Sequence, residues 1–278
     1  MPEGDTLFRA AERLHRALAG RTVTQFESVF PALTRVDLDQ PVAGQSVNAV
    51  TARGKHLLMA FSGGLTLHTH LRMNGSWHLY RLGTLWRRPH HDMRLRLVAG
   101  RVEAVGFNVP VAEWLSADAL SRHSTLSRLG PDLLADTFDA TAAAARLAAQ
   151  GTRAMDDVLL DQRVLCGIGN VFKSEILYLA RVHPARQAGS LTGDELARLV
   201  RVARRLLAVN VAPRSHHLTA ARGRRTTGRM HPDEQLWVYG RQGQPCFTCG
   251  AAVACRATGR DSRLTFWCPS CQPLVPEG

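Results

Sequence analysis

The chain has 278 residues, with 35 lysines and arginines against 23 aspartates and glutamates, and its formal net charge is +12. That length favours two domains over one, because single hydrophobic cores stop growing before it. No apolar run approaches the ~20 residues of a membrane helix, and the opening Met-Pro-Glu-Gly-Asp does not read as a secretion signal. We therefore expect a cytoplasmic protein with an acidic partner, for which nucleic acid is the leading candidate.

The positive charge is concentrated in one internal stretch. Between Leu196 and Pro232 there is no acidic residue, and the stretch holds nine arginines: Arg198, Arg201, Arg204, Arg205, Arg214, Arg222, Arg224, Arg225 and Arg229. Such a run is usually a solvated face or a disordered tail. Because this one begins on an amphipathic helix inside the chain, it favours a phosphate-facing surface. Lysine occurs only at Lys55 and Lys173, so these two positions stand out.

The N-terminal part is expected to hold one helix followed by strands. Asp5 is a plausible N-cap, Gly20 a stop, and one helix face carries Leu7, Ala11, Leu14 and Leu18. After Gly20 the apolar period changes to two. This pattern predicts strands at 21–30, 56–61, 65–71, 77–81, 92–98 and 101–105. We expect a sheet domain over residues 1–118 and a linker over 119–136, marked by the turn signal at 129–132.

The remainder is expected to be helical and then cysteine-rich. Apolar spacing predicts helices at 140–150, 154–162, 171–181 and 192–209. Thr192 and Glu195 have the spacing of a capping box at the start of the last helix. These helices predict a domain over residues 137–232 that includes the arginine-rich loop. Short strands and turns around the cysteines then form a domain over 233–278.

Four of the six cysteines form two pairs, Cys246-x2-Cys249 and Cys268-x2-Cys271, with 18 residues between them. This is the spacing of a structural zinc site with four thiolate ligands. Disulfides are disfavoured in a chain without an export signal. Four sulfur ligands leave no open position on the metal, so zinc here is expected to hold the fold without taking part in catalysis.

Two further features favour phosphate binding. Arg260 and Arg263 lie on the hairpin between the cysteine pairs, where arginines suit contacts to phosphate, although Arg260 alone is equally well an ordinary surface residue. The segment 166–170 (Cys-Gly-Ile-Gly-Asn) joins two helices, and its glycines permit a tight turn with outward-facing N–H groups. A plain corner between helices explains this turn nearly as well.

The N-terminus is a candidate reaction centre. Removal of the initiator Met before a small residue exposes Pro2 as a secondary amine, and α-amino groups have a pKa near 7.7–8.0. A partly neutral amine can attack an aldehyde-like carbon, and the Glu3 carboxylate can transfer a proton. Many chains begin with the same residues and have no chemistry there, so this motif decides nothing by itself.

Taken in order, the motifs resemble the formamidopyrimidine-DNA glycosylase and endonuclease VIII family of bifunctional DNA repair enzymes. They are Met-Pro-Glu-Gly, Arg-Gly-Lys55-His, His-Leu-Arg-Met73-Asn-Gly, Leu-Gly-Pro-Asp132, the Gly-Ile-Gly-Asn170 turn with Glu175, Val-Tyr-Gly-Arg241, and Arg263 before Cys-Pro-x-Cys-Gln. The resemblance covers Pro2 to Gln272. It implies an α+β chain: an N-terminal β-sandwich with flanking helices, a helix–two-turn–helix DNA-binding domain and a C-terminal zinc-finger β-hairpin.

The resemblance also implies roles for single residues. Pro2 corresponds to the nucleophile that attacks C1′ of the damaged nucleotide, Glu3 to a general acid/base, and Lys55 to a lysine that contacts phosphate and supports catalysis. Asn170 and Arg263 correspond to a phosphate clamp, and Glu175 to a supporting position. Met73 is a candidate wedge with Arg72 on the same turn, or equally well a core methionine, and Lys173 is a candidate phosphate contact.

The opening Pro-Glu-Gly-Asp-Thr is similar to the endonuclease VIII branch and to its actinobacterial members, in which no metal or redox cofactor serves catalysis. Oxidised pyrimidines are therefore the expected substrates, with 8-oxoguanine or formamidopyrimidine lesions as the second choice. An inactive DNA-binding relative and a zinc-ribbon RNA-binding protein are further alternatives.

We expect a bacterial, nucleoid-associated monomer that binds damaged DNA. His68 and His70 share one face of a strand, and no metal is assigned to them.

Overall fold

The computed structural model describes residues 2–212, 223–229, 231–259 and 262–274. The chain divides into two compact units, an N-terminal unit of residues 1–128 and a C-terminal unit of residues 129–278. The finer boundaries expected at residues 118, 136 and 232 stay predictions. Arg214, Arg222 and Arg260 lie outside the described residues. Among the described helices, none is long and apolar enough to span a bilayer.

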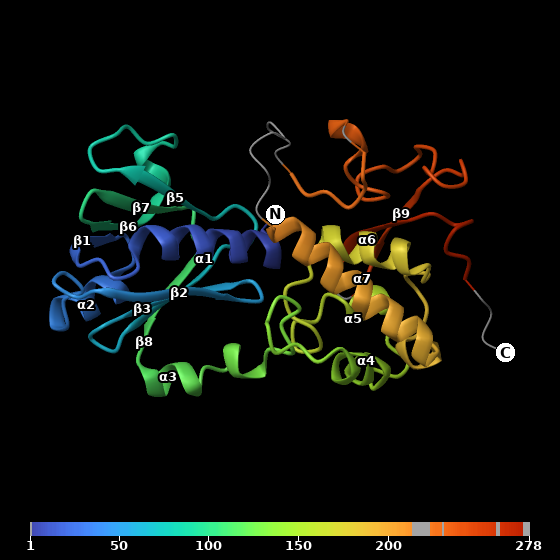
Figure 1. Ribbon diagram of the computed structural model, residues 1–278, viewed down its shortest axis with the longest axis horizontal. Helices are drawn as coiled ribbons and strands as arrows, with labels where there is room; N and C mark the ends of the chain where they lie inside the picture. Colours follow the sequence, from blue (N-terminus) through green and yellow to red (C-terminus); the bar gives the residue numbers. More distant parts are fainter. Residues whose placement is uncertain (1, 213–222, 230, 260–261, 275–278) are drawn as a thin grey trace. The chain divides into compact units, whose positions relative to one another are not determined.

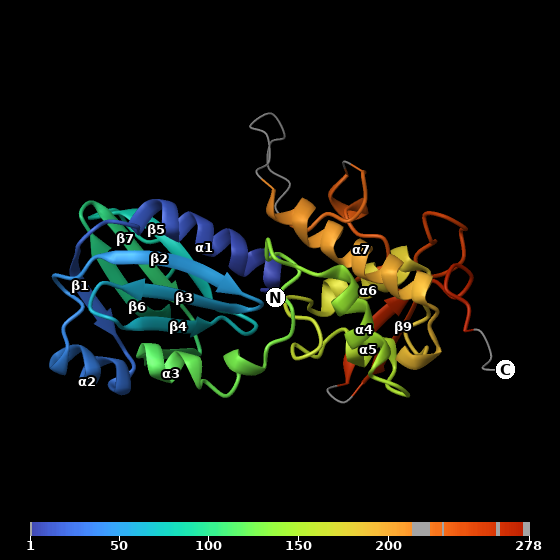
Figure 2. The ribbon, with the colours of Figure 1, turned by 60° about the horizontal axis from the view of Figure 1, so that its bottom comes forward.

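The N-terminal unit is a sandwich of two antiparallel four-stranded sheets (Figures 1 and 2). One sheet has the order β1-β6-β7-β5, formed by Val23–Ser28, Met93–Ala99, Val102–Phe107 and Ser76–Arg81. The other has the order β2-β3-β4-β8, formed by Val47–Arg53, His56–Phe61, Thr66–His70 and Val111–Leu115. Side chains of both sheets meet in one apolar core, which includes Leu57, Leu67, Leu95 and Leu97. The predicted sandwich is confirmed.

Helix α1 (Gly4–Leu18) packs on β2 with the predicted apolar face, because Leu7, Ala11, Leu14 and Leu18 are buried. The predicted N-cap was wrong: Glu3 is the cap residue, and its carbonyl accepts the N–H groups of Thr6 and Leu7 at 2.9 and 3.2 Å. Asp5 lies inside the first turn, where its carboxylate pairs with Arg9 at 3.1 Å. Thr6 Oγ1 also donates to this carboxylate, at 3.2 Å.

The periodicity of the sequence missed two helices and two strands of this unit, namely α2 (Pro31–Asp39), α3 (Ala117–Ser121), β2 and β8. Pro31 at the first helical position is the signal that could have revealed α2. Strand β2 shows no strict alternation of buried and exposed residues, because it pairs with β3 on one side and packs under α1 on its face. By contrast, β3 has the predicted bounds.

The C-terminal unit begins with four helices around a second apolar core: α4 (Ala140–Ala148), α5 (Met155–Val158), α6 (Asn170–Ala180) and α7 (Gly193–Val211). The capping box of Thr192 and Glu195 is confirmed. Helix α5 is shorter than predicted. The Asp161 carboxylate accepts the backbone N–H of Arg163 at 3.1 Å, a local bond that turns the chain where the helix was expected to continue.

Helix α7 lies between α6 and α4, and α6 also contacts the C-terminal hairpin (Figure 1). That hairpin consists of β9 (Ala254–Thr258) and β10 (Arg263–Trp267), paired from Thr258–Arg263 to Ala254–Trp267. A third apolar cluster, with Tyr178, Val238 and Phe266, joins α6 to the hairpin. The spatial order β10, α6, α7, α4 therefore separates the hairpin from α4.

Candidate active site and metal centre

Pro2 and Glu3 stand at the first turn of α1. Pro2 is half-buried and Glu3 is fully buried at the cap position of this 15-residue helix. The aligned peptide dipoles place partial positive charge at this end, which favours a carboxylate there. The amine and the carboxylate expected to act together are thus held by a rigid helix packed on the sheet.

Lys55 lies in the two-residue turn Gly54–Lys55 that joins β2 to β3, directly after the Arg53–His56 pair. Gly54 has a φ of 58°, a left-handed conformation that glycine adopts without strain. Lys55 is half-buried, and its charge lowers the pKa of both His56 and His70. The predicted lysine is therefore at the tip of a tight hairpin, beside two imidazoles.

A chain of hydrogen bonds runs from this hairpin to β8. His56 Nδ1 lies 2.8 Å from His68 Nε2, and His68 Nδ1 lies 2.8 Å from Glu113 Oε1. His123 Nε2 lies 2.9 Å from the same Glu113 oxygen. An ionised carboxylate only accepts, so both rings donate to Glu113, and His68 Nε2 accepts from His56. Sequence analysis noticed His68 but missed its partners, because β8 and residue 123 are distant in sequence.

His68, Glu113 and His123 could be taken for a metal site, since their donor atoms lie within 4.8 Å of one another. The outer contacts of His123 do not fit a metal. A metal-bound imidazole donates its second N–H to an acceptor. His123 Nδ1 instead accepts the backbone N–H groups of Thr125 and Leu126, each at 3.2 Å. Its proton must therefore be on Nε2, and the cluster is a hydrogen-bond network that fixes the tautomers.

Burial decides the protonation of this network. Desolvation, together with the charge of Lys55 and neighbouring imidazoles, lowers the pKa of His56 to about 3 and that of His70 to about 4. Desolvation raises the pKa of Glu113, but hydrogen bonds from His68 and His123 outweigh it and the net shift is downward. At neutral pH both rings are therefore neutral, and the cationic residues at this end of the hairpin are Arg53 and Lys55.

We expect His56→Asn to flatten the pH dependence of stability. In the folded chain His56 takes up a proton near pH 3, and in the unfolded chain near pH 6.5. The neutral His56 ring therefore makes its full contribution to the free energy of unfolding above pH 6.5. On acidification this contribution declines, by up to about 1.4 kcal/mol per pH unit. Asparagine keeps a donor near the Nδ1 position and does not titrate.

Urea unfolding of both proteins between pH 7 and 4.5 measures this difference. His91→Asn is the matched control, because the His91 side chain is 82% exposed. Parallel stability curves for wild type and His56→Asn would contradict a neutral buried His56.

Arg72 and Met73 occupy the loop between β4 and β5. Arg72 has a φ of 45°, and its N–H donates to His70 Nδ1 at 3.1 Å. Met73 is 51% exposed, so it is a surface residue of the described unit and not a core methionine. Gly75 closes the loop, since a Cβ there would lie 2.6 Å from the Leu71 carbonyl. Contact of Arg72 and Met73 with DNA stays a prediction.

In the C-terminal unit, Asn170 and Lys173 lie on the face of α6 that contacts β10. Asn170 Nδ2 donates to the Leu264 carbonyl at 2.9 Å, and its Oδ1 is buried without a hydrogen-bond partner in the described structure. Lys173 is 1% exposed and donates from Nζ to Thr265 Oγ1 at 2.7 Å. Both side chains therefore attach α6 to the hairpin, and their contacts with phosphate stay predictions.

Arg263, the first residue of β10, is exposed and lines a cleft of about 320 Å³ together with Lys173. The cleft also contains charged residues that sequence analysis missed: Arg153, Arg163, Asp156, Asp157 and Asp161. Asp161 pairs with Arg153 and Arg163, at 3.1 and 3.0 Å. Hydrogen bonds from Arg163 hold the pKa of Asp161 at about 2, against the effect of burial. Within the described residues, Arg263 makes no ion pair with a carboxylate, unlike Arg153 and Arg163.

Glu175 is a fully buried carboxylate of α6 that holds the segment after the arginine-rich loop. It accepts three successive backbone N–H groups, from Trp237 at 2.8 Å and from Val238 and Tyr239 at 2.9 Å each. Thr226 Oγ1 donates to it as well. Burial raises the pKa of Glu175, and these hydrogen bonds oppose that shift. Its supporting role is therefore to anchor this stretch of backbone. Arg241 anchors the same segment by donating to the carbonyls of Trp237 and Pro245.

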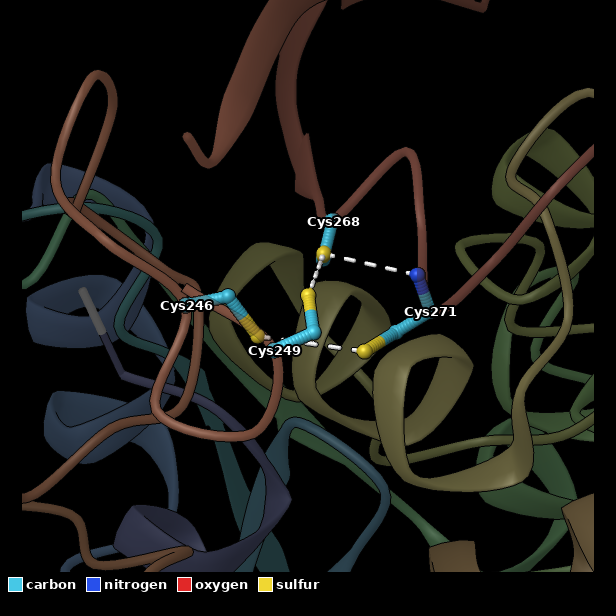
Figure 3. A group of neighbouring side chains, drawn as sticks. All are labelled: Cys246, Cys249, Cys268 and Cys271. Carbon is cyan, nitrogen blue, oxygen red and sulfur yellow. Dashed lines mark hydrogen bonds between the residues drawn. The ribbon is translucent and has the colours of Figure 1, made fainter. Parts of the chain in front are cut away.

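The four paired cysteines converge at the base of the hairpin (Figure 3). The sulfur atoms of Cys249 and Cys268 lie 3.4 Å apart, and those of Cys246 and Cys271 lie 3.9 Å apart. A tetrahedral zinc ion with Zn–S bonds near 2.3 Å requires sulfur separations of about 3.8 Å, whereas a disulfide requires about 2 Å. Backbone N–H groups of Thr248 and Cys271 point at two of the sulfurs at 3.4 Å, as donors to thiolates do. The donor set fits zinc.

Comparisons with known proteins agree with this arrangement. Residues 1–107 match the formamidopyrimidine-DNA glycosylase N-terminal domain, and residues 129–220 match the H2TH domain of the same glycosylase. The fold is similar to the crystal structure of Lactococcus lactis formamidopyrimidine-DNA glycosylase bound to DNA with an AP site. The TM-score is 0.80 at 23% identity, over 98% of this chain and 100% of that one.

Two curated relatives match almost end to end. A probable endonuclease 8 2 of Streptomyces coelicolor is 44% identical over 98% of this chain and 94% of its own length. The DNA-(apurinic or apyrimidinic site) lyase Nei2 of Mycolicibacterium smegmatis is 38% identical over 98% of this chain and 99% of its own.

The fold and these matches define a DNA glycosylase and DNA-(apurinic or apyrimidinic site) lyase of base excision repair. The chain belongs to the formamidopyrimidine-DNA glycosylase family, in its endonuclease 8 branch with actinobacterial relatives.

Proposed function

We propose that this enzyme removes oxidised pyrimidines from DNA through an iminium at Pro2 and cuts the strand by β,δ-elimination. The observation that carries the proposal is the placement of Pro2 and Glu3 at the head of α1, in the same unit as the Lys55 hairpin. Attack on a sugar carbon next to a phosphate requires three groups: a nucleophile, a buried carboxylate and a cation. The similarity to endonuclease 8 proteins supports the choice of pyrimidines.

In this mechanism the target nucleotide leaves the base stack before chemistry. The Pro2 nitrogen forms a bond to C1′ while the C1′–base bond breaks, and Glu3 transfers a proton that assists opening of the sugar ring. The resulting iminium makes the C2′ proton acidic. Its loss expels the 3′ phosphate, a second elimination expels the 5′ phosphate, and water releases the sugar fragment from Pro2.

The other predicted residues bind the substrate. Lys55 neutralises a phosphate next to the target sugar, and the neutral rings of His56 and His70 add no competing charge to this hairpin. Asn170 and Arg263 hold phosphates at the N-terminal end of α6 and the start of β10, with Lys173 fixing the hairpin to the helix. Arg72 and Met73 contact the DNA where the nucleotide is extruded.

The four cysteines would hold a zinc ion, and its coordination bonds would cross-link the two cysteine pairs and fix the small hairpin. The thiolates, with their N–H donors, hold this ion, and the cluster supplies no group to the reaction. The protein acts as a monomer on damaged DNA in the bacterial cytoplasm and nucleoid.

Borohydride trapping combined with a lesion panel tests this function. Wild-type protein is expected to form a covalent adduct with abasic DNA and to cut oligonucleotides with dihydrouracil or thymine glycol faster than those with 8-oxoguanine. Faster cutting at 8-oxoguanine would instead favour the purine-lesion alternative. Absence of both adduct and cutting, with retained binding to abasic DNA, would identify an inactive relative.

Removal of zinc is expected to unfold the hairpin and abolish DNA binding. The third apolar cluster is small, so residues 246–259 and 262–271 depend on the metal for their order. Treatment with a thiol-reactive mercurial and EDTA should release about one zinc per chain, measured with a chromogenic chelator, and DNA affinity should return when zinc is added back. Full DNA affinity in the metal-free protein would argue against this role.

Arg263→Gln is expected to weaken binding to undamaged duplex DNA and to reduce the slope of log K against log salt by about 1, because one phosphate contact is lost. Arg35→Gln, an exposed arginine of α2, is the charge-matched control. Fluorescence anisotropy between 50 and 300 mM salt measures both slopes. An unchanged slope for Arg263→Gln would remove Arg263 from the clamp.

A further inference from the structure

The C-terminal unit carries a long apolar groove that the repair reaction does not use. It has a volume of about 810 Å³ and runs between the outer faces of α4 and α7. Its floor is built mainly from small side chains, Ala140, Ala144, Ala145, Ala148, Ala197 and Ala208. Because alanine side chains are short, the backbone of another helix can approach this floor closely, at the 8–10 Å interaxial distance of packed helices. Apolar surface of this extent outside the core marks an interaction site.

Three arginines of α7 line the same groove. Arg201, Arg204 and Arg205 are exposed, and the spacing of three and four residues places them on one helix face with Ala197 and Ala208. Within the described residues none of the three has a carboxylate partner, whereas Arg153, Arg163 and Arg186 are all paired. Arg204 lies over the Phe138 ring at 5.2 Å. The groove therefore offers unneutralised positive charge along an apolar floor.

The groove is separate from the predicted phosphate clamp. Asn170, Lys173 and Ser174 attach α6 to β10, while Phe172 and Ile176 on another face of α6 belong to the helical core. Helix α7 packs against that core, and the groove lies beyond it, between α7 and α4. Part of the arginine-rich stretch that predicted a DNA surface is thus directed into a different site.

The chemistry of the groove selects an acidic protein segment. Surfaces that bind DNA are polar and positively charged, and phosphates gain nothing from an alanine floor. Helix α4 has nine residues, about 14 Å at 1.5 Å per residue, which matches about nine residues of a docked helix. An amphipathic helix seats its apolar face in such a groove, and its carboxylates can pair with rim arginines.

We propose that the groove between α4 and α7 is the docking site for an acidic amphipathic helix of another protein. The apolar side chains of that helix contact the alanine floor, and its carboxylates pair with Arg201, Arg204 and Arg205. This interaction goes beyond the repair reaction and requires neither Pro2 nor the lesion. It gives the enzyme a means of being recruited by a partner while the clamp stays available.

A fluorescein-labelled peptide tests the proposal with the full chain. The probe is a helix-forming peptide of about 15 residues, with leucines spaced three and four apart and glutamates elsewhere. Anisotropy is expected to show saturable binding. A scrambled peptide of the same composition, which lacks an apolar face, is expected to bind at least tenfold more weakly.

Two variants locate the binding. Ala145→Trp fills the groove at an exposed position of α4, and Arg201→Gln/Arg204→Gln/Arg205→Gln removes the rim charge without changing the floor. Each is expected to weaken peptide binding about tenfold or more. The control Arg13→Gln/Arg16→Gln/Arg35→Gln removes the same charge from exposed positions of α1 and α2, and is expected to change binding less than twofold.

Equal binding of the scrambled peptide, equal losses in the two triple variants, or no binding at millimolar peptide would each overturn the proposal. Displacement of the peptide by undamaged duplex DNA, together with weaker DNA binding by Ala145→Trp, would make the groove a DNA surface and overturn it as well. Should Ala145→Trp melt below wild type, the surface triple variant alone decides. Lyase activity is not part of the readout, so a failure of the proposed repair function leaves this test intact.

Discussion

Pro2→Leu is expected to give no borohydride-trapped adduct with abasic DNA and to lower strand cutting to the background rate. A large second residue prevents removal of the initiator methionine, so the amine moves one residue, about 3.8 Å, away from the Glu3 cap position. Reacting atoms must lie within about 3–3.5 Å, and a displacement of this size removes the nucleophile from the sugar carbon. Gel analysis of the trapped complex and single-turnover cutting measure the effect.

Glu12→Gln is the matched control, because Glu12 is an exposed residue on the same helix. It is expected to form the adduct as wild type does. Retained binding of abasic DNA by Pro2→Leu would show that only the chemistry is lost. An adduct of Pro2→Leu in wild-type yield, or a wild-type adduct that maps to a peptide other than the N-terminal one, would exclude Pro2 as the nucleophile.

Glu175→Gln is expected to destabilise the C-terminal unit by about 3–5 kcal/mol, among the largest effects of any conservative change in the chain. The carboxylate accepts four donors, three of them consecutive backbone N–H groups of residues 237–239. An amide retains one oxygen, and its NH2 group would face backbone N–H groups that it cannot satisfy. Each buried donor left unpaired costs about 1–3 kcal/mol.

Urea unfolding followed by tryptophan fluorescence measures this loss, since Trp237 itself donates to Glu175. The control in the same unit is Glu234→Gln, because Glu234 makes an exposed ion pair with Arg229 at 3.3 Å and is expected to contribute under 1 kcal/mol. A loss below 1 kcal/mol for Glu175→Gln would mean that residues 237–239 are held by their own packing and not by the carboxylate.

Local patterns in the sequence were enough to predict most of the fold. The apolar face of α1, the bounds of β3 and the capping box at Thr192 all depend on residues within one helix or one hairpin. The missed strands, β2 and β8, depend on distant neighbours. Strand β2, for example, pairs with β3 and lies under α1, so its burial follows from packing and not from alternation along the strand.

The candidate site divides in the same way. The cysteine pairs could be found from spacing alone, because two thiolates on one tight turn approach each other whatever the rest of the chain does. The chain His56–His68–Glu113–His123 could not, because its members come from β3, β4, β8 and the segment after α3. Spacing gives no information on which strands become neighbours in a sheet.

The net charge of +12 and the order of motifs from Pro2 to Cys271 determined the class of partner and the family, since both are properties of composition and linear spacing. Only the tertiary structure decided where the charge lies. It buries Lys173 against Thr265, exposes Arg263 at a cleft, and places Arg201, Arg204 and Arg205 beside an apolar groove. Residues adjacent in sequence on a helix point to different neighbours, so one run of arginines serves more than one surface.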